Sequence, residues 1–204
     1  MLDAAARRLI DPPLNTAGRW LARTGATPDM VTLAGLCLGL ACAVAVALGA
    51  FALALVLLIL SRLADGLDGA VARATRPSDY GGYLDIVSDF LFYGAVPFGF
   101  VLVDPGANAV AGAFLLWSFY FNGASFLGYA ILAERHDLRT AAQGVKSLYY
   151  SNGLLEGTET ILFFVLLCIL PGYFPQLAWA FGTLCFASGA LRLWGARAAF
   201  RSEE

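Results

Sequence analysis

The residues best suited to chemistry are four aspartates in two adjacent apolar segments: Asp65, Asp68, Asp85 and Asp89. The first two are three residues apart and the last two are four apart, so on helices each pair shares one face. If the two helices are neighbours, all four carboxylates converge on one point. A carboxylate at membrane depth is costly and usually faces a polar cavity, so the pattern indicates a functional site.

Carboxylates that converge in this way cannot all ionise without a positive countercharge. Oxygen ligands favour a hard divalent cation, which predicts Mg²⁺ or Mn²⁺ over zinc. Two cations that share bridging aspartates would form the kind of centre that clamps phosphoryl oxygens. Small residues on the same helix leave space for a bulky ligand: Gly66, Gly69, Ala70 and Ala72. Arg73 lies near that face and can neutralise phosphate charge.

The alternative for this segment is a set of salt-bridged acids that closes a helix bundle. It fits poorly, because the carboxylates outnumber the arginines of the segment.

The composition places these aspartates in a membrane protein. Of 204 residues, 59% are hydrophobic and 14% are charged, against roughly 25% charged in an ordinary soluble domain. The mean hydropathy is +0.71, and apolar stretches near the ~20 residues that cross a bilayer recur along the chain. The net charge of −2 excludes a generally basic nucleic-acid binder. The four cysteines lie in apolar runs without metal-ligand spacing, which indicates small buried hydrophobic residues.

Hydropathy predicts an all-α, polytopic membrane protein in which one domain fills residues 1–204. Its six predicted transmembrane helices, which together form a bundle over residues 31–198, are residues 31–49, 51–74, 83–103, 109–133, 146–170 and 177–198. Residues 1–24 mix apolar side chains with arginines and Trp20, which predicts an amphipathic helix in the headgroup layer, broken at Pro12 and Pro13. A solvated leader is the alternative.

The basic residues predict the orientation in the membrane. All 13 lysines and arginines fall in the N-terminal segment, in the polar connectors 75–82 and 134–145 or their flanking turns, or at the C-terminal end. The short connectors 48–50, 104–106 and 171–173 carry none. By the positive-inside rule, both termini, both polar connectors and the acidic site are cytoplasmic.

The acidic segments also match the pattern of a known family. Eight residues at fixed spacing form one signature: Asp65-x-x-Asp68-Gly69-x-x-Ala72-Arg73 and then Gly81-x-x-x-Asp85-x-x-x-Asp89. It resembles the signature of the CDP-alcohol phosphotransferases. Residues 27–32 resemble the Pro-Asn-x-x-Thr element that enters this family's first span, with Asp29 in place of Asn. The chain is similar to a bacterial inner-membrane branch that carries Gly-Leu-x-Glu-Gly-Thr-Glu-Thr, here Gly153 to Thr160.

The resemblance implies that the phosphoalcohol part of a CDP-alcohol passes to an acceptor hydroxyl while CMP leaves. Carried over by position, Asp65, Asp68 and Asp85 would bind metal, and Asp89 would be the general base that also touches a second ion. The cofactor would be Mg²⁺ or Mn²⁺, as two ions. The residues that would hold the nucleotide and pyrophosphate are Asp29, Thr32, Gly69, Arg73 and Ser78. The resemblance also implies a homodimer in the bacterial inner membrane.

The acceptor side of this chain departs from the family. Members that use inositol phosphate or glycerol phosphate carry extra arginines in the fifth span, where this chain has Leu148, Gly157 and Thr160. The loss of charge-assisted contacts favours an uncharged or zwitterionic alcohol over a phosphorylated one. The predicted acceptor-binding residues are Lys146, Glu156, Glu159 and Arg192.

For the donor, the chain most resembles users of CDP-diacylglycerol, so the expected function is transfer of a phosphatidyl group to a small alcohol in phospholipid biosynthesis. One alternative is transfer of phosphocholine or phosphoethanolamine from a soluble CDP-alcohol to diacylglycerol. A second is a cation carrier that uses the same acids, although the sequence shows no internal repeat. A third is an inactive paralogue, which the intact signature disfavours.

Overall fold

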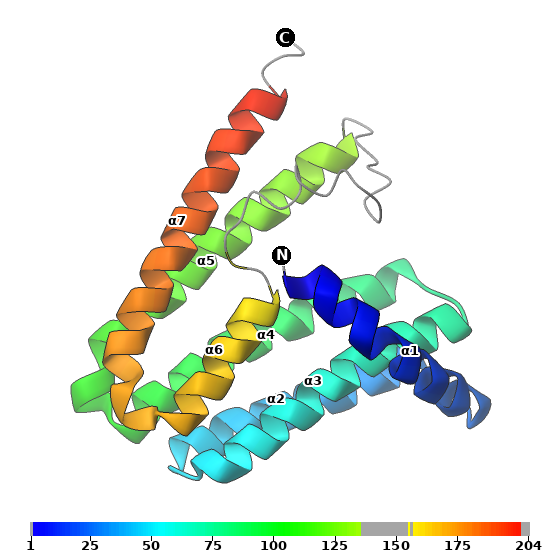
Figure 1. Ribbon diagram of the computed structural model, residues 1–204, viewed down its shortest axis with the longest axis horizontal. Helices are drawn as coiled ribbons and strands as arrows, with labels where there is room; N and C mark the ends of the chain where they lie inside the picture. The colour runs from blue at the N-terminus through cyan, green and yellow to red at the C-terminus, as the bar shows by residue number, and fades with distance from the viewer. Residues whose placement is uncertain (1, 136–154, 156, 201–204) are drawn as a thin grey trace.

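A computed structural model describes residues 2–135, 155 and 157–200 of the chain (Figure 1). In these residues the chain is helical and forms no strand, which confirms the all-α prediction. The helices are α1 (Leu2–Arg23), α2 (Pro28–Ala47), α3 (Phe51–Ala74), α4 (Asp79–Val103), α5 (Pro105–Arg135), α6 (Gly157–Ile169) and α7 (Phe174–Phe200), with a 3-10 turn at Pro171–Tyr173.

Local sequence accounts for the ends of the helices that carry the site. Thr27 caps α2, because its side-chain oxygen accepts a hydrogen bond from the backbone N–H of Met30 at 3.3 Å. Ser78 caps α4 in the same way, by accepting from the N–H of Gly81 at 3.0 Å. After α2 the chain turns at Gly49, whose φ of +72° favours glycine. The cap at Ser78 starts α4 four residues before the predicted span, so α4 extends beyond the apolar segment.

Helix α2 brings the two acid-bearing helices together, because both α3 and α4 pack against it. Glycines permit the close approach. A Cβ atom at Gly39 would lie 2.6 Å from the ring of Phe92, and one at Gly35 would lie 3.1 Å from Cβ of Ala64. On the other side of α4, helices α5 and α7 run side by side (Figure 1). The site is therefore built on a three-helix unit of α2, α3 and α4.

A continuous apolar core joins this unit to the later helices. Phe92 and Phe100 of α4 are fully buried, as are Phe164 of α6 and Phe174 of α7. The rings of Phe100 and Phe174 stack with centroids 4.9 Å apart. Three of the four cysteines are buried as predicted, whereas Cys37 is exposed on the surface of α2.

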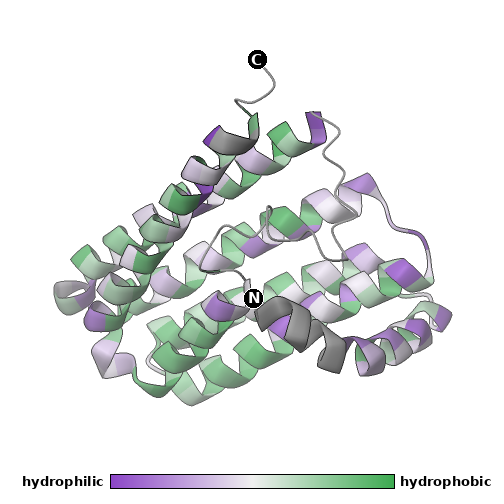
Figure 2. Ribbon diagram, turned by 45° about the horizontal axis from the view of Figure 1, so that its top comes forward, coloured by the Kyte–Doolittle hydropathy of each residue, from purple (hydrophilic) through white to green (hydrophobic). Residues whose placement is uncertain are grey.

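Within the described residues, four helical segments are long and apolar enough to cross a membrane: α2, α4, α5 and residues 171–197. Helix α3 differs because it carries Arg62, Asp65, Asp68 and Arg73 from its middle to its end. The described part of α6 has only 13 residues. Figure 2 shows apolar residues along the bundle and polar residues gathered on α1 and the nearby ends of α3 and α4. The predicted start of the fifth span, residue 146, lies outside the described residues.

The predicted break at Pro12 and Pro13 is wrong, because α1 continues through both prolines. Packing against α3 supports the helix beyond them: a Cβ atom at Gly18 would lie only 2.6 Å from Cβ of Ala70. The carbonyl oxygen of Pro12 also accepts a hydrogen bond from the hydroxyl of Thr16 at 3.1 Å. Tertiary contact therefore outweighs the local preference of proline for a helix end. The placement of α1 in the headgroup layer stays a prediction.

Candidate active site

Three of the four aspartates meet between α3 and α4. One carboxylate oxygen from each of Asp65, Asp85 and Asp89 lies within 4.8 Å of the other two, and all three side chains are partly buried. Asp65 comes from α3 and the other two come from successive turns of α4. Three carboxylate oxygens this close together are a donor set that fits a hard divalent cation.

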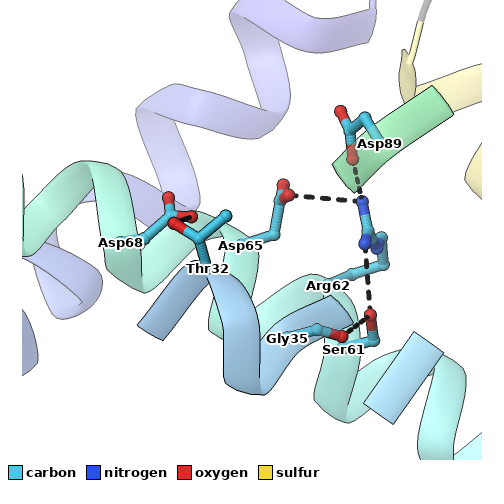
Figure 3. A network of polar contacts seen from close by, with 7 residues as sticks. All are labelled: Thr32, Gly35, Ser61, Arg62, Asp65, Asp68 and Asp89. Carbon is cyan, nitrogen blue, oxygen red and sulfur yellow. Dashed lines mark hydrogen bonds and ion pairs between the residues drawn. The ribbon is translucent and has the colours of Figure 1, made fainter. Parts of the chain in front are cut away.

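Asp68 lies apart from this group of three. Its carboxylate is buried, and Oδ2 accepts a hydrogen bond from the hydroxyl of Thr32 on α2 at 2.6 Å (Figure 3). The spacing of the aspartates predicts one point of convergence. The structure instead gives a three-carboxylate group with Asp68 and Thr32 beside it, because Asp68 sits one helical turn further along α3 and faces α2.

The structure adds Arg62 to the site. Its Nη1 donates to Oδ1 of Asp89 at 2.8 Å and to Oδ1 of Asp65 at 3.4 Å (Figure 3). The charge pattern predicts that this arginine flanks a polar connector, but it lies about three turns before the end of α3. The signal that could have found it is its spacing, since a residue three positions before Asp65 shares its helix face.

A cavity of about 590 Å³ contains these groups. Its lining comes from four helices and includes Asp11 and Leu14 of α1, Gly157 and Thr158 of α6, and all four signature aspartates. Five carboxylates and two arginines, Arg62 and Arg73, line it. The described lining therefore has an excess of negative charge, which suits a cation that in turn binds phosphate.

The residues predicted to hold the nucleotide fall into two places. Gly69 and Arg73 line the cavity. Asp29 and Ser78 lie together at the first turns of α2 and α4, since a Cβ atom at Gly81 would be 3.3 Å from Oδ1 of Asp29 and 3.1 Å from Oγ of Ser78. Both places are at the end of the bundle that carries the acidic group.

The predicted acceptor residues are more dispersed. Lys146 and Glu156 lie outside the described residues. Glu159 is in the first turn of α6, and Arg192 is buried on α7. The Nη1 group of Arg192 donates to Oδ1 of Asn122 at 2.9 Å and to Oγ of Ser125 at 2.6 Å, which ties α7 to α5. Within the described residues, neither Glu159 nor Arg192 lines the cavity.

Helix α1 contributes a contact that the sequence does not reveal. Nε and Nη2 of Arg73 donate to Oδ1 of Asn15 at 3.2 and 2.9 Å, so Asn15 orients an arginine at the rim of the cavity.

We expect Asn15→Ala to raise the Kd for a CDP-alcohol about two- to tenfold, the effect of about one lost hydrogen bond at an exposed site. Equilibrium binding of the labelled nucleotide with Mg²⁺ measures this. Thr16→Ala, one residue along the same helix, is the control, and an equal effect of both substitutions would contradict the prediction.

With this geometry established, comparison with known proteins identifies the class. The model of the CDP-alcohol phosphatidyltransferase family matches residues 26–194. The chain therefore belongs to this family, and it is a membrane phosphotransferase.

Individual relatives agree with this assignment. The chain is 46% identical over 194 residues to inner membrane protein YnjF of Escherichia coli, covering 95% of this chain and 94% of that protein. It is 36% identical over 97 residues to archaetidylinositol phosphate synthase of Pyrococcus horikoshii, covering 47% of this chain and 52% of the synthase. Its fold is similar to that of Mycobacterium tuberculosis phosphatidylinositol phosphate synthase, solved with CDP-DAG bound, with a TM-score of 0.72, 20% identity and coverage of 90% and 93% of the two chains.

Proposed function

We propose that the protein transfers a phosphatidyl group from CDP-diacylglycerol to the hydroxyl of a small alcohol and releases CMP, as a step of phospholipid biosynthesis. The observation that carries this proposal is the three-carboxylate group in the same cavity as Arg73. Family membership supports the reaction class. The fold shared with a synthase solved with CDP-DAG supports the choice of donor.

The donor set fits a divalent cation, and Mg²⁺ or Mn²⁺ is the proposed cofactor, with two ions expected from the signature. Asp65, Asp85 and Asp89 would hold it, and Asp68 would add a further carboxylate beside them. When bound, the cation supplies positive charge that stabilises the pyrophosphate and the leaving CMP.

The residues of the cavity and of the nearby helix ends would have separate roles in the transfer reaction. A carboxylate oxygen of Asp89 accepts the proton of the acceptor hydroxyl. The hydroxyl oxygen forms a bond to the phosphorus that carries the diacylglycerol, and the bond from this phosphorus to the CMP oxygen breaks. Arg73 and the open backbone at Gly69 hold the pyrophosphate. Asp29, Thr32 and Ser78 hold the cytidine end of the donor.

The acceptor is proposed to be an uncharged or zwitterionic alcohol that binds near Lys146, Glu156, Glu159 and Arg192. We expect Arg192→Ala to raise the KM of the acceptor more than that of the donor, because the substitution removes a buried cation of the predicted acceptor site. Initial rates with each substrate varied in turn measure the two constants. Arg192→Lys keeps the charge and is the control. A fall in melting temperature with both KM values unchanged would limit Arg192 to joining α5 and α7.

For the membrane, we propose six spans with both termini and the active site on the cytoplasmic side of a bacterial inner membrane, and a homodimer. The relative in Escherichia coli is an inner membrane protein, and the basic residues favour this orientation. Labelling of single cysteines at the two ends of α7 in intact cells tests the topology, since only the cysteine near residue 173 should react with an impermeant reagent.

The test of the reaction is CMP release by the purified protein in detergent with Mg²⁺ and CDP-diacylglycerol. Serine, inositol, glycerol, glycerol 3-phosphate and inositol phosphate serve as acceptors, and mass spectrometry identifies the lipid product. CMP release with one acceptor, lost in Asp89→Asn, supports the proposal. Activity only with CDP-choline or CDP-ethanolamine and diacylglycerol would support the alternative donor. No CMP release and no nucleotide binding would contradict both.

A further inference from the structure

Arg62 is held in place from several sides. Besides its contacts with Asp65 and Asp89, its Nη2 donates to Oγ of Ser61 at 3.1 Å, and Ser61 in turn donates to the carbonyl oxygen of Gly35 on α2 at 2.7 Å (Figure 3). The guanidinium carbon lies 4.2 Å from the centroid of the Phe92 ring. The side chain is only 12% exposed.

These contacts come from all three helices that build the site. The ring of Phe92 and the carboxylate of Asp89 belong to α4, and the hydroxyl of Ser61 is fixed by α2. Moving the guanidinium out would break the charge-assisted hydrogen bonds and the ring contact together. It would also leave the partly buried carboxylates of Asp65 and Asp89 without this cation, which is unfavourable. Arg62 is therefore a positive charge with a fixed position, and we expect it to stay beside the carboxylates of Asp65 and Asp89 when a cation binds.

The position of Arg62 has two consequences for the three-carboxylate group. Its positive charge reduces the formal charge of the group from −3 to −2, which weakens attraction for a divalent cation. Its bond to Oδ1 of Asp89 fixes the orientation of that carboxylate and does not engage Oδ2. Arg62 thus lowers the affinity of the site for a cation and orients the carboxylate of Asp89.

We propose that Arg62 is a positioning residue and a resident counter-cation: it aims Asp89 and holds the affinity for the divalent cation below the value that the carboxylates alone would give. The part that concerns Asp89 as a base rests on the proposed function. The part that concerns cation affinity does not, because it can be measured without any substrate.

The first measurement is Mn²⁺ binding by electron paramagnetic resonance, on the full-length protein in detergent with no substrate. We expect Arg62→Met to bind Mn²⁺ at least about tenfold more tightly than the wild type, because a like charge has been removed from the site. Arg62→Lys keeps the charge and should stay within about threefold of the wild type. Arg197→Met removes an exposed arginine of α7 outside the cavity and should change nothing.

A structural role alone predicts the opposite sign. If Arg62 only ties α3 to α4, Arg62→Met would loosen the carboxylates and bind Mn²⁺ equally or more weakly, and that result would overturn the inference. Should Arg62→Met fail to elute as a monodisperse species, Arg62→Gln replaces it, since glutamine removes the charge but keeps a hydrogen-bond donor. The same tighter binding is then required.

The second measurement is steady-state CMP release. We expect kcat to fall at least about tenfold in Arg62→Lys, with the donor KM within about threefold of the wild type, because lysine lacks the planar fork that aims Asp89 while contacting Ser61. An unchanged kcat in Arg62→Lys would overturn the positioning role. If the wild type releases no CMP with any donor while the Mn²⁺ series behaves as expected, the proposed function fails and the counter-cation role stands.

Discussion

Asp89→Asn is expected to lower kcat for CMP release by about a hundred- to ten-thousandfold, the usual contribution of a general base. Asparagine has the same shape and its Oδ1 can still accept the hydrogen bond from Arg62, but its amide cannot take the proton of the acceptor hydroxyl. Binding of the CDP-alcohol with Mg²⁺ should fall far less than turnover does, because Asp65, Asp68 and Asp85 keep their carboxylates and the asparagine side chain keeps one oxygen that can contact the cation.

Rates over a range of enzyme concentrations, together with equilibrium nucleotide binding, measure both effects. The matched control is Asp79→Asn, an exposed aspartate in the first turn of α4 that does not line the cavity. Full activity of Asp89→Asn would remove Asp89 as the base. A loss of donor binding as large as the loss of turnover would limit Asp89 to holding the cation.

Asp65→Asn is expected to have the second large effect, which is a loss of cation affinity. Asp65 is the carboxylate from α3 that completes the group formed by Asp85 and Asp89 of α4, so its loss leaves the other two carboxylates of this group on a single helix. We expect Mn²⁺ affinity to fall about a hundredfold or more, since even indirect partners of metal ligands contribute 10- to 100-fold. Nucleotide binding that depends on the cation should fall with it.

Paramagnetic resonance of free Mn²⁺ and nucleotide binding with and without Mg²⁺ test this prediction, again beside Asp79→Asn. A variant that binds Mn²⁺ like the wild type but has lost activity would show that Asp65 acts on the substrate and does not hold the cation. Asp65→Asn and Asp89→Asn together separate cation binding from proton transfer. Asp65→Asn should lose binding of both the cation and the nucleotide, whereas Asp89→Asn should lose turnover while most of the binding remains.

The sequence was sufficient wherever the signal is local or periodic. The spacings Asp65 to Asp68 and Asp85 to Asp89 predict shared helix faces, and all four residues do line one cavity. The all-α fold follows from the apolar segments, and the predicted connector at residues 48–50 contains the turn at Gly49. The eight-residue signature indicated the family that residues 26–194 match.

The partners of these residues depend on the packing of the helices. Asp68 bonds to Thr32, Arg62 to Asp89 and Arg73 to Asn15, and the three pairs are separated by 36, 27 and 58 positions. Such pairs depend on how closely α1 and α4 approach their neighbours, which glycines such as Gly18 and Gly39 control. A local pattern specifies the face of a helix. The packing of one helix on another specifies what that face contacts. The packing of α1 on α3 also supports a helix that continues past two prolines.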